Sequence, residues 1–101
     1  MITPEQRVFT ILADVPAGRV VGYGQLAQMA GLAGRARWVG RLMGQLPKDS
    51  TLPWHRVMKS NGHLAFSEQD PRFEKQQRLL ETEGVPVISG KVAQHYFWQP
   101  A

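Results

Sequence analysis

The first apolar pattern of the chain has helical spacing, because its members recur every three or four residues: Val8, Phe9, Ile11, Leu12 and Val15. Thr3 can cap such a helix, Pro4 suits its first position, and Gln6 stands three residues after Thr3, as in a capping box. Pro16-Ala17-Gly18 ends the pattern. The sequence therefore predicts a helix that begins after Thr3.

Two shorter helical patterns follow an extended piece around Val20-Val21. One covers residues 23–31 and the other residues 35–46, and the turn Gly31-Leu32-Ala33-Gly34 joins them. Their inward apolar residues are Leu26, Ala27, Met29 and Ala30 in the first, and Trp38, Val39, Leu42, Met43 and Leu46 in the second. Two short helices with a glycine-containing turn are typical of a helix-turn-helix, although any helical hairpin has a similar pattern.

The second half predicts a small β element and a fourth helix. Asn61-Gly62 is a strong hairpin turn signal, so residues 56–66 are expected to form a two-stranded wing. Asp70-Pro71 begins the helix and Gly84 ends it, and residues 85–92 look extended. The predicted fold class is mainly α with a small β-hairpin or wing, a winged-helix-like helix-turn-helix, in a single domain over residues 1–101.

The composition excludes several kinds of chemistry. The chain has no cysteine, which removes thiol nucleophiles, disulfides and thiolate metal sites. The three histidines are scattered, so no metal and no cofactor is expected. No apolar run approaches the roughly 20 residues that cross a bilayer, and residues 1–4 do not resemble a signal peptide. These features favour a cytoplasmic protein.

Positive charge is concentrated in the first part of the chain. Residues 1–62 hold eight Lys and Arg against three acids, and the remainder holds four against five. Arg37 and Arg41 lie on one face of the third predicted helix, and Ala36 and Gly40 make a smooth strip beside them. Such a face suits a nucleic acid backbone. A solvated basic surface, with the two small residues serving helix packing, is the alternative.

Four motifs, in order, carry a family resemblance: Val20-Val21-Gly22-Tyr23-Gly24-Gln25-Leu26-Ala27, Ala36-Arg37-Trp38-Val39-Gly40, Pro53-Trp54-His55-Arg56-Val57 and Leu79-Leu80-Glu81-Thr82-Glu83-Gly84-Val85. From about Pro4 to Ile88 the chain resembles the C-terminal, DNA-binding domain of O6-alkylguanine-DNA alkyltransferases. Their Pro-Cys-His-Arg motif carries the cysteine that accepts the alkyl group, and here Trp54 stands at that position. The chain is identified as a member of the alkyltransferase-like proteins, their non-enzymatic relatives, which often carry Pro-Trp-His-Arg.

The resemblance implies DNA-binding roles for several residues. Tyr23 matches the tyrosine that crowds the phosphate 3′ to the target, and Arg37 matches the finger that fills the base stack after the nucleotide flips out. Ala36 and Gly40 would allow the helix to enter the minor groove, with Arg41 beside them. Ser60 matches a hydroxyl near the target phosphate. From the residues alone, Tyr23 fits equally a half-buried aromatic at a helix start.

The resemblance also implies a pocket for the flipped alkylguanine, lined by Pro53, Trp54, Val57, Phe66 and Ser67. His55 and Glu83 match the relay that activates the absent thiol, and are expected to persist as a buried hydrogen-bonded pair. Arg56 is interpreted as a structural ion-pair partner. Without the family, Trp54 would be read as a core aromatic.

Some positions depart from the family pattern. Leu46 stands where an asparagine usually braces the relay, and Phe66-Ser67-Glu68-Gln69 replaces a glycine-rich segment, so the pocket lid must differ. Trp38 replaces a small residue, with no role assigned. The aromatic tail Tyr96-Phe97-Trp98 is expected to cover the core.

The resulting hypothesis is a monomeric protein that binds O6-alkylguanine in double-stranded DNA without alkyl transfer and marks it for nucleotide excision repair proteins. The expected location is cytoplasmic and nucleoid-associated, with no membrane partner. Two alternatives stay open: a winged-helix regulator that reads base edges in the major groove, and an enzyme in which His55 and Glu83 activate water.

Overall fold

Helix α1 (Pro4–Asp14) begins as its sequence predicts in the computed structural model, which describes residues 1–100. The Thr3 hydroxyl accepts from the Gln6 N–H at 3.1 Å, and the Gln6 side-chain oxygen accepts from the Thr3 N–H at 2.8 Å, which completes the capping box. Val8 and Leu12 are buried on the helix face, and Val15 is buried just beyond its end. The predicted first helix is therefore confirmed.

Helices α2 (Tyr23–Met29) and α3 (Ala36–Gly44) form the predicted helix-turn-helix, and both are shorter than residues 23–31 and 35–46. Gly31 and Gly34 have φ of +76° and +85°, so the chain leaves α2 and turns sharply before α3. At the other end, Pro47 disfavours helical backbone at Leu46, and α3 stops at Gly44.

The small β element is present, but its strand pairing differs from the prediction. Strand β1 (Val21–Gly22) pairs in parallel with β2 (Val57–Met58). A tight turn does occur after β2, where the Gly62 N–H bonds the Lys59 carbonyl at 2.9 Å. Beyond the turn, His63 forms a bridge with Lys91. Residues 56–66 therefore do not form a two-stranded hairpin, because residues distant in sequence supply the partners.

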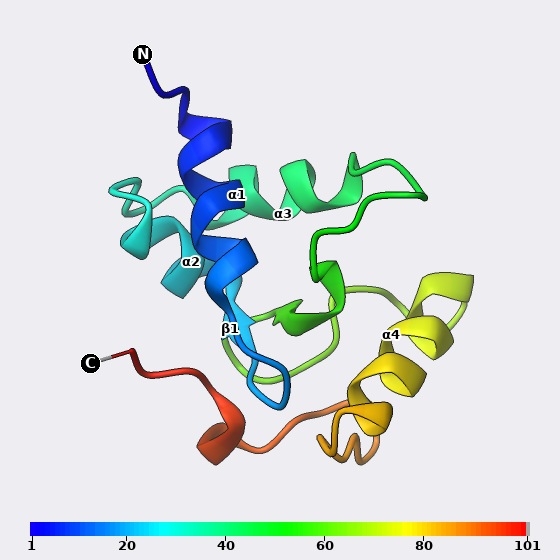
Figure 1. The fold of residues 1–101 in the computed structure, drawn as a ribbon. Helices are drawn as coiled ribbons and strands as arrows, with labels where there is room; N and C mark the ends of the chain where they lie inside the picture. Colours follow the sequence, from blue (N-terminus) through cyan, green and yellow to red (C-terminus); the bar gives the residue numbers. More distant parts are fainter. Residues whose placement is uncertain (101) are drawn as a thin grey trace.

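Helix α4 (Pro71–Thr82) lies on the far side of the β element from α1 (Figure 1). The Asp70 carboxylate caps it by accepting from the Arg72 N–H at 2.9 Å, and Gly84, with φ of +83°, follows its end as predicted. Two short 3-10 helices, η1 (Trp54–Arg56) and η2 (Gln94–Tyr96), complete the elements. Mainly helical architecture with a small β element is the fold class that the sequence predicted.

Two buried clusters hold these elements together. One joins α1, α2 and α3 through residues such as Leu12, Leu26 and Val39. The other joins the β element to α4 and to the segment after it through Met58 and Leu80. The aromatic tail covers both, as expected: Trp98 packs on the first cluster, and Tyr96 and Phe97 on the second.

No helix within residues 1–100 combines the length and the apolar character needed to span a membrane. The same residues contain no group of three His, Asp or Glu side chains arranged to hold a metal ion.

Candidate nucleic-acid interface

Tyr23 and Gly40 bring α2 and α3 into close contact at the first part of the site. A Cβ placed on Gly40 would lie 3.8 Å from the Tyr23 ring, so the ring rests directly on the glycine backbone. Burial raises the pKa of the Tyr23 hydroxyl, and the positive charge of Arg72 offsets this only in part. Tyr23 is therefore a neutral phenol at physiological pH and can donate a hydrogen bond to a phosphate oxygen.

Ser60 is held beside this helix pair by a glycine. A Cβ on Gly22 would lie 3.0 Å from the Ser60 Cα and 3.1 Å from its Oγ, so a larger residue there would push Ser60 aside. A Cβ on Gly24 would be 3.5 Å from the same Oγ and 3.9 Å from the Cβ of Ala36. The hydroxyl of Ser60 and the small side chain of Ala36 thus both lie close to Gly24, at the start of α2.

Arg37 and Arg41 supply the charge on this face. Both are exposed on α3, and neither forms an ion pair with a carboxylate among residues 1–100. Together with Tyr23, Gly40 and Ala65 they line a depression of about 560 Å³. The structure therefore brings the six predicted DNA-binding residues onto one surface, built from α2, α3 and the turn after β2.

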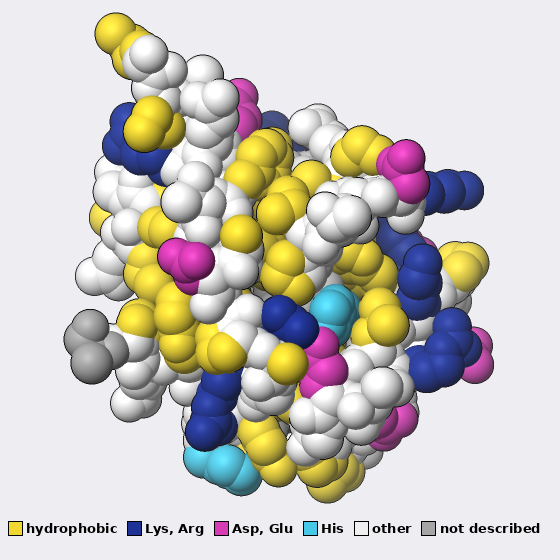
Figure 2. All heavy atoms as spheres, viewed as in Figure 1, with side chains coloured by type: hydrophobic (Ala, Val, Ile, Leu, Met, Phe, Trp, Pro, Cys, Tyr) yellow, Lys and Arg dark blue, Asp and Glu magenta, His cyan; other side chains and the backbone are white. Residues whose placement is uncertain are grey.

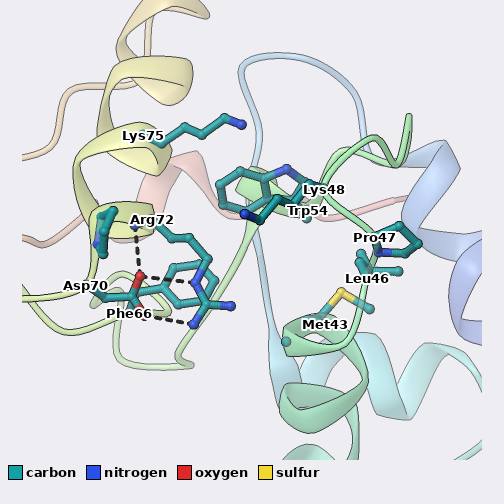
Figure 3. A pocket seen from close by; sticks show the side chains of 11 residues that line it. Met43, Leu46, Pro47, Lys48, Trp54, Phe66, Asp70, Arg72 and Lys75 are labelled. Atoms are coloured by element: carbon teal, nitrogen blue, oxygen red, sulfur yellow. Dashed lines mark hydrogen bonds and ion pairs between the residues drawn. The ribbon is translucent and has the colours of Figure 1, made fainter.

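A second cavity, also of about 560 Å³, lies between the end of α3, the loop that follows it and the start of α4. Trp54 and Phe66 face each other edge to face, with ring centroids 5.9 Å apart (Figure 3). The full lining is Met43, Gly44, Leu46, Pro47, Lys48, Trp54, Phe66, Asp70, Pro71, Arg72 and Lys75. Apolar and aromatic walls with a few polar groups are typical of small-molecule sites.

Of the five predicted pocket residues, Trp54 and Phe66 line this cavity and the other three do not. Val57 is buried in β2, Pro53 lines a different depression beside Ala13 and His55, and Ser67 is exposed. Residues that the sequence analysis did not assign to the pocket take their places, chiefly Lys48, Arg72 and Lys75. Leu46, noted there only as a departure from the family, lines the cavity as well.

His55, Arg56 and Glu83 form one ion-pair network behind Trp54. The His55 Nε2 lies 2.9 Å from Glu83 Oε2, the Arg56 Nε donates to Glu83 Oε1 at 3.0 Å, and Arg56 Nη1 donates to the Val15 carbonyl at 2.8 Å. Burial alone would raise the pKa of Glu83, but hydrogen bonds from Arg56 and His55 outweigh it and lower that pKa to about 2. The network ties the Trp54 loop to the end of α4 and to the end of α1.

Gln76 provides a second connection, which the sequence analysis missed. Its side chain is fully buried; its amide nitrogen donates to the carbonyls of His55 at 3.1 Å and Val57 at 2.9 Å, and its oxygen accepts from the Ala65 N–H at 3.1 Å. One side chain of α4 therefore fixes the backbone on both sides of the cavity. A signal existed: Gln76 lies at helical spacing between Phe73 and Leu80, a polar residue on an apolar face.

Trp38 lies outside both depressions. It packs against the first buried cluster and, with Pro4, Leu32 and Arg35, lines a small hollow beside the start of α1. Its place is structural, because it packs on the first buried cluster.

Comparisons with known proteins agree with this geometry. Residues 3–85 match the family model described as the 6-O-methylguanine DNA methyltransferase DNA-binding domain. A protein of Vibrio parahaemolyticus named DNA base-flipping protein is 42% identical over 96 residues, covering 93% of this chain and 94% of its own length. Alkyltransferase-like protein 1 of Schizosaccharomyces pombe is 30% identical over 100 residues, covering 93% of each chain.

A solved structure of one relative has the same fold. The crystal structure of S. pombe Atl1 in complex with damaged DNA containing O6-carboxymethylguanine superimposes with a TM-score of 0.87 at 30% identity, covering 96% of this chain and 95% of that one.

Proposed function

The chain belongs to the family of the 6-O-methylguanine DNA methyltransferase DNA-binding domain, and we propose that it binds O6-alkylguanine in double-stranded DNA and holds the lesion flipped out, unchanged. It is an alkyltransferase-like protein and not an alkyltransferase. Trp54 occupies the position of the acceptor cysteine, and the chain has no other thiol. The relatives that match it over nearly their whole length are named as base-flipping and alkyltransferase-like proteins.

The observation that carries the proposal is that neighbouring residues border the two depressions. Helix α3 borders both, with Gly40 and Arg41 on one and Met43 one turn later on the other. Ala65 lines the first and its neighbour Phe66 the second. A basic, small-residue surface therefore lies beside an aromatic cavity, an arrangement that suits nucleotide flipping.

Different residues act at different steps of nucleotide flipping. Tyr23 and Ser60 meet the phosphate of the target nucleotide, and the small residues of α3 let the helix approach the minor groove. Arg37 enters the vacated stack, which offsets part of the few kcal/mol that unpairing and unstacking cost. Trp54 and Phe66 then hold the base, since stacking on an aromatic ring contributes about 1–3 kcal/mol per base.

The lesion is left in place because the pocket holds no thiol to accept the alkyl group. An indole has a donor N–H and no basic lone pair. Glu83, with a pKa of about 2 and both oxygens hydrogen-bonded, is too weak a base to activate water at neutral pH. This disfavours the water-activating alternative. The regulator alternative needs base-edge readers, whereas the smooth strip of Ala36 and Gly40 favours approach to a backbone.

The protein's role in the cell follows from holding a lesion without repairing it. The bound, distorted site is passed to nucleotide excision repair, whose damage-recognition proteins are the proposed partners. The expected cytoplasmic, nucleoid-associated location and monomeric state belong to this proposal.

Two measurements test it. Titration of matched duplexes should give tighter binding to O6-methylguanine than to guanine, and the mass of DNA and protein after long incubation should be unchanged. Equal affinity for both duplexes, or transfer of the alkyl mass to protein or solvent, contradicts the proposal. For the repair step, the protein should increase loading of purified excision-repair damage-recognition proteins on the alkylated duplex only; unchanged loading contradicts that step.

A further inference from the structure

Two lysines line the aromatic cavity from opposite sides. Lys48 comes from the loop after α3, and Lys75 from the exposed side of α4. The amino nitrogen of Lys75 lies 6.0 Å from the centroid of the Trp54 ring. Figure 3 shows the indole of Trp54 between α4 and the loop that carries Lys48, and in Figure 2 basic side chains gather along the edge formed by this loop and α4.

The acidic residue of the cavity does not neutralise these lysines. Asp70 is the one carboxylate in the lining, and Arg72 holds it with Nη2 to Oδ2 at 2.7 Å and Nε to Oδ1 at 3.1 Å. The Arg72 guanidinium also lies 4.2 Å from the centroid of the Phe66 ring. Lys48 and Lys75 form no ion pair among residues 1–100, so the lining carries two positive charges in excess.

We infer that this cavity favours O6-alkylguanines whose substituent ends in a negative charge over neutral substituents of the same size. The inference rests on the proposed function, because it concerns the same flipped base. A guanine that stacks on the Trp54 ring projects its O6 substituent into the remaining cavity, which Lys48 and Lys75 line. The substituent class is a short alkyl chain that ends in a carboxylate.

The expected preference is moderate, because both lysines are exposed. Ion pairs between exposed groups contribute about 0.2–1 kcal/mol each, so two pairs correspond to roughly twofold to thirtyfold in affinity. The apolar neighbours Met43, Leu46 and Pro47 limit the access of water from one side of the cavity, which favours a value above the lower end of that range. We expect a preference of about fivefold to tenfold at low salt, declining as salt screens the charges.

The test compares two adducts that differ only in charge. O6-carboxymethylguanine ends in a carboxylate, and O6-carbamoylmethylguanine ends in a neutral amide of nearly the same shape. Each is placed in the same duplex and titrated with the wild-type protein and with the Lys48→Gln, Lys75→Gln double variant, with the guanine duplex as baseline. Lys91→Gln is the matched control, since Lys91 is exposed on the turn near residue 90 and lines none of the described depressions.

The wild type and the Lys91→Gln control should prefer the carboxylate about fivefold to tenfold, and the double variant less than twofold with its affinity for the amide kept. Equal binding of both adducts, each tighter than guanine, overturns the inference and leaves the proposed function intact. If neither adduct binds more tightly than guanine, the proposed function fails and the inference with it. If the double variant loses affinity equally for all duplexes, the lysines contact phosphates, and the inference is wrong.

Discussion

Substitution of Gln76 with glutamate tests whether this side chain fixes the backbone around the aromatic cavity. The change keeps the shape and the oxygen that accepts from the Ala65 N–H, but it removes both N–H donors to the carbonyls of His55 and Val57. A carboxylate oxygen would then face two carbonyl oxygens at about 3 Å in a fully buried position.

The magnitude follows from the two carbonyls that lose their partners. An unpaired buried acceptor costs about 1–3 kcal/mol, so the variant should lose about 2–6 kcal/mol of unfolding free energy at pH 7. That is a large part of the ~5–15 kcal/mol of an ordinary domain. Burial beside carbonyl oxygens should also raise the pKa of the new carboxyl group in the folded protein above its unfolded value.

The sign of the pH dependence is therefore fixed. The penalty is complete above the raised folded pKa and disappears below the unfolded pKa, so stability should recover by more than ~1 kcal/mol between pH 7 and pH 5. Urea unfolding at the two pH values measures this, with Gln94→Glu, an exposed glutamine, as the control. A loss below about 0.5 kcal/mol at pH 7, the size of an ordinary surface change, would refute the role given to Gln76.

Three further predictions concern the neighbouring residues. Because the pKa of Glu83 is lowered to about 2, its contribution, on the order of 3 kcal/mol, should be complete above about pH 5 and be lost as the pH falls toward 2. Urea unfolding of Glu83→Gln should lack this acid dependence; an unchanged profile contradicts the ion-pair network. Trp54→Cys should give little or no alkyl transfer by protein mass, because Leu46 and the lid also depart from the enzymes; rapid stoichiometric transfer would show a competent site. Arg37→Ala should weaken binding to an alkylated duplex more than to a single strand with the same lesion. Equal losses would make Arg37 a plain phosphate contact, whose removal lowers the salt slope of the logarithm of affinity by about one.

Local sequence signals predicted the elements well. Two of these signals involve residues close together in the sequence: the capping box of Thr3 and Gln6, and the glycine after α4. Each is present in the structure. The β element shows the limit of such signals. The turn at Asn61-Gly62 formed, but β2 pairs with β1, more than 30 residues away, because a turn signal specifies the bend and says nothing of distant partners.

The candidate site was predictable where a motif fixes the position of a residue. Tyr23, Arg37 and Trp54 are examples, and they lie on the two depressions. The motif did not specify which side chains around Trp54 face the cavity: Val57 points into the core, since β2 is buried by its pairing with β1. Arg72 and Lys75 reach Trp54 through the packing of α4 against η1, and Lys48 reaches it from the loop after α3.

The most direct test of the central claim, that Trp54 forms a wall of the recognition pocket, is the ratio of affinities for O6-methylguanine and guanine duplexes. Trp54→Ala should reduce this ratio by about fivefold to 150-fold, the equivalent of a lost stack of ~1–3 kcal/mol. Its affinity for the guanine duplex should stay within about twofold, since that binding depends on the α2–α3 surface. Trp38→Phe, a change outside both depressions, should leave the ratio unchanged. Circular dichroism first establishes that each variant is folded. A folded Trp54→Ala protein that keeps the full ratio for small and large alkyl groups would contradict the account.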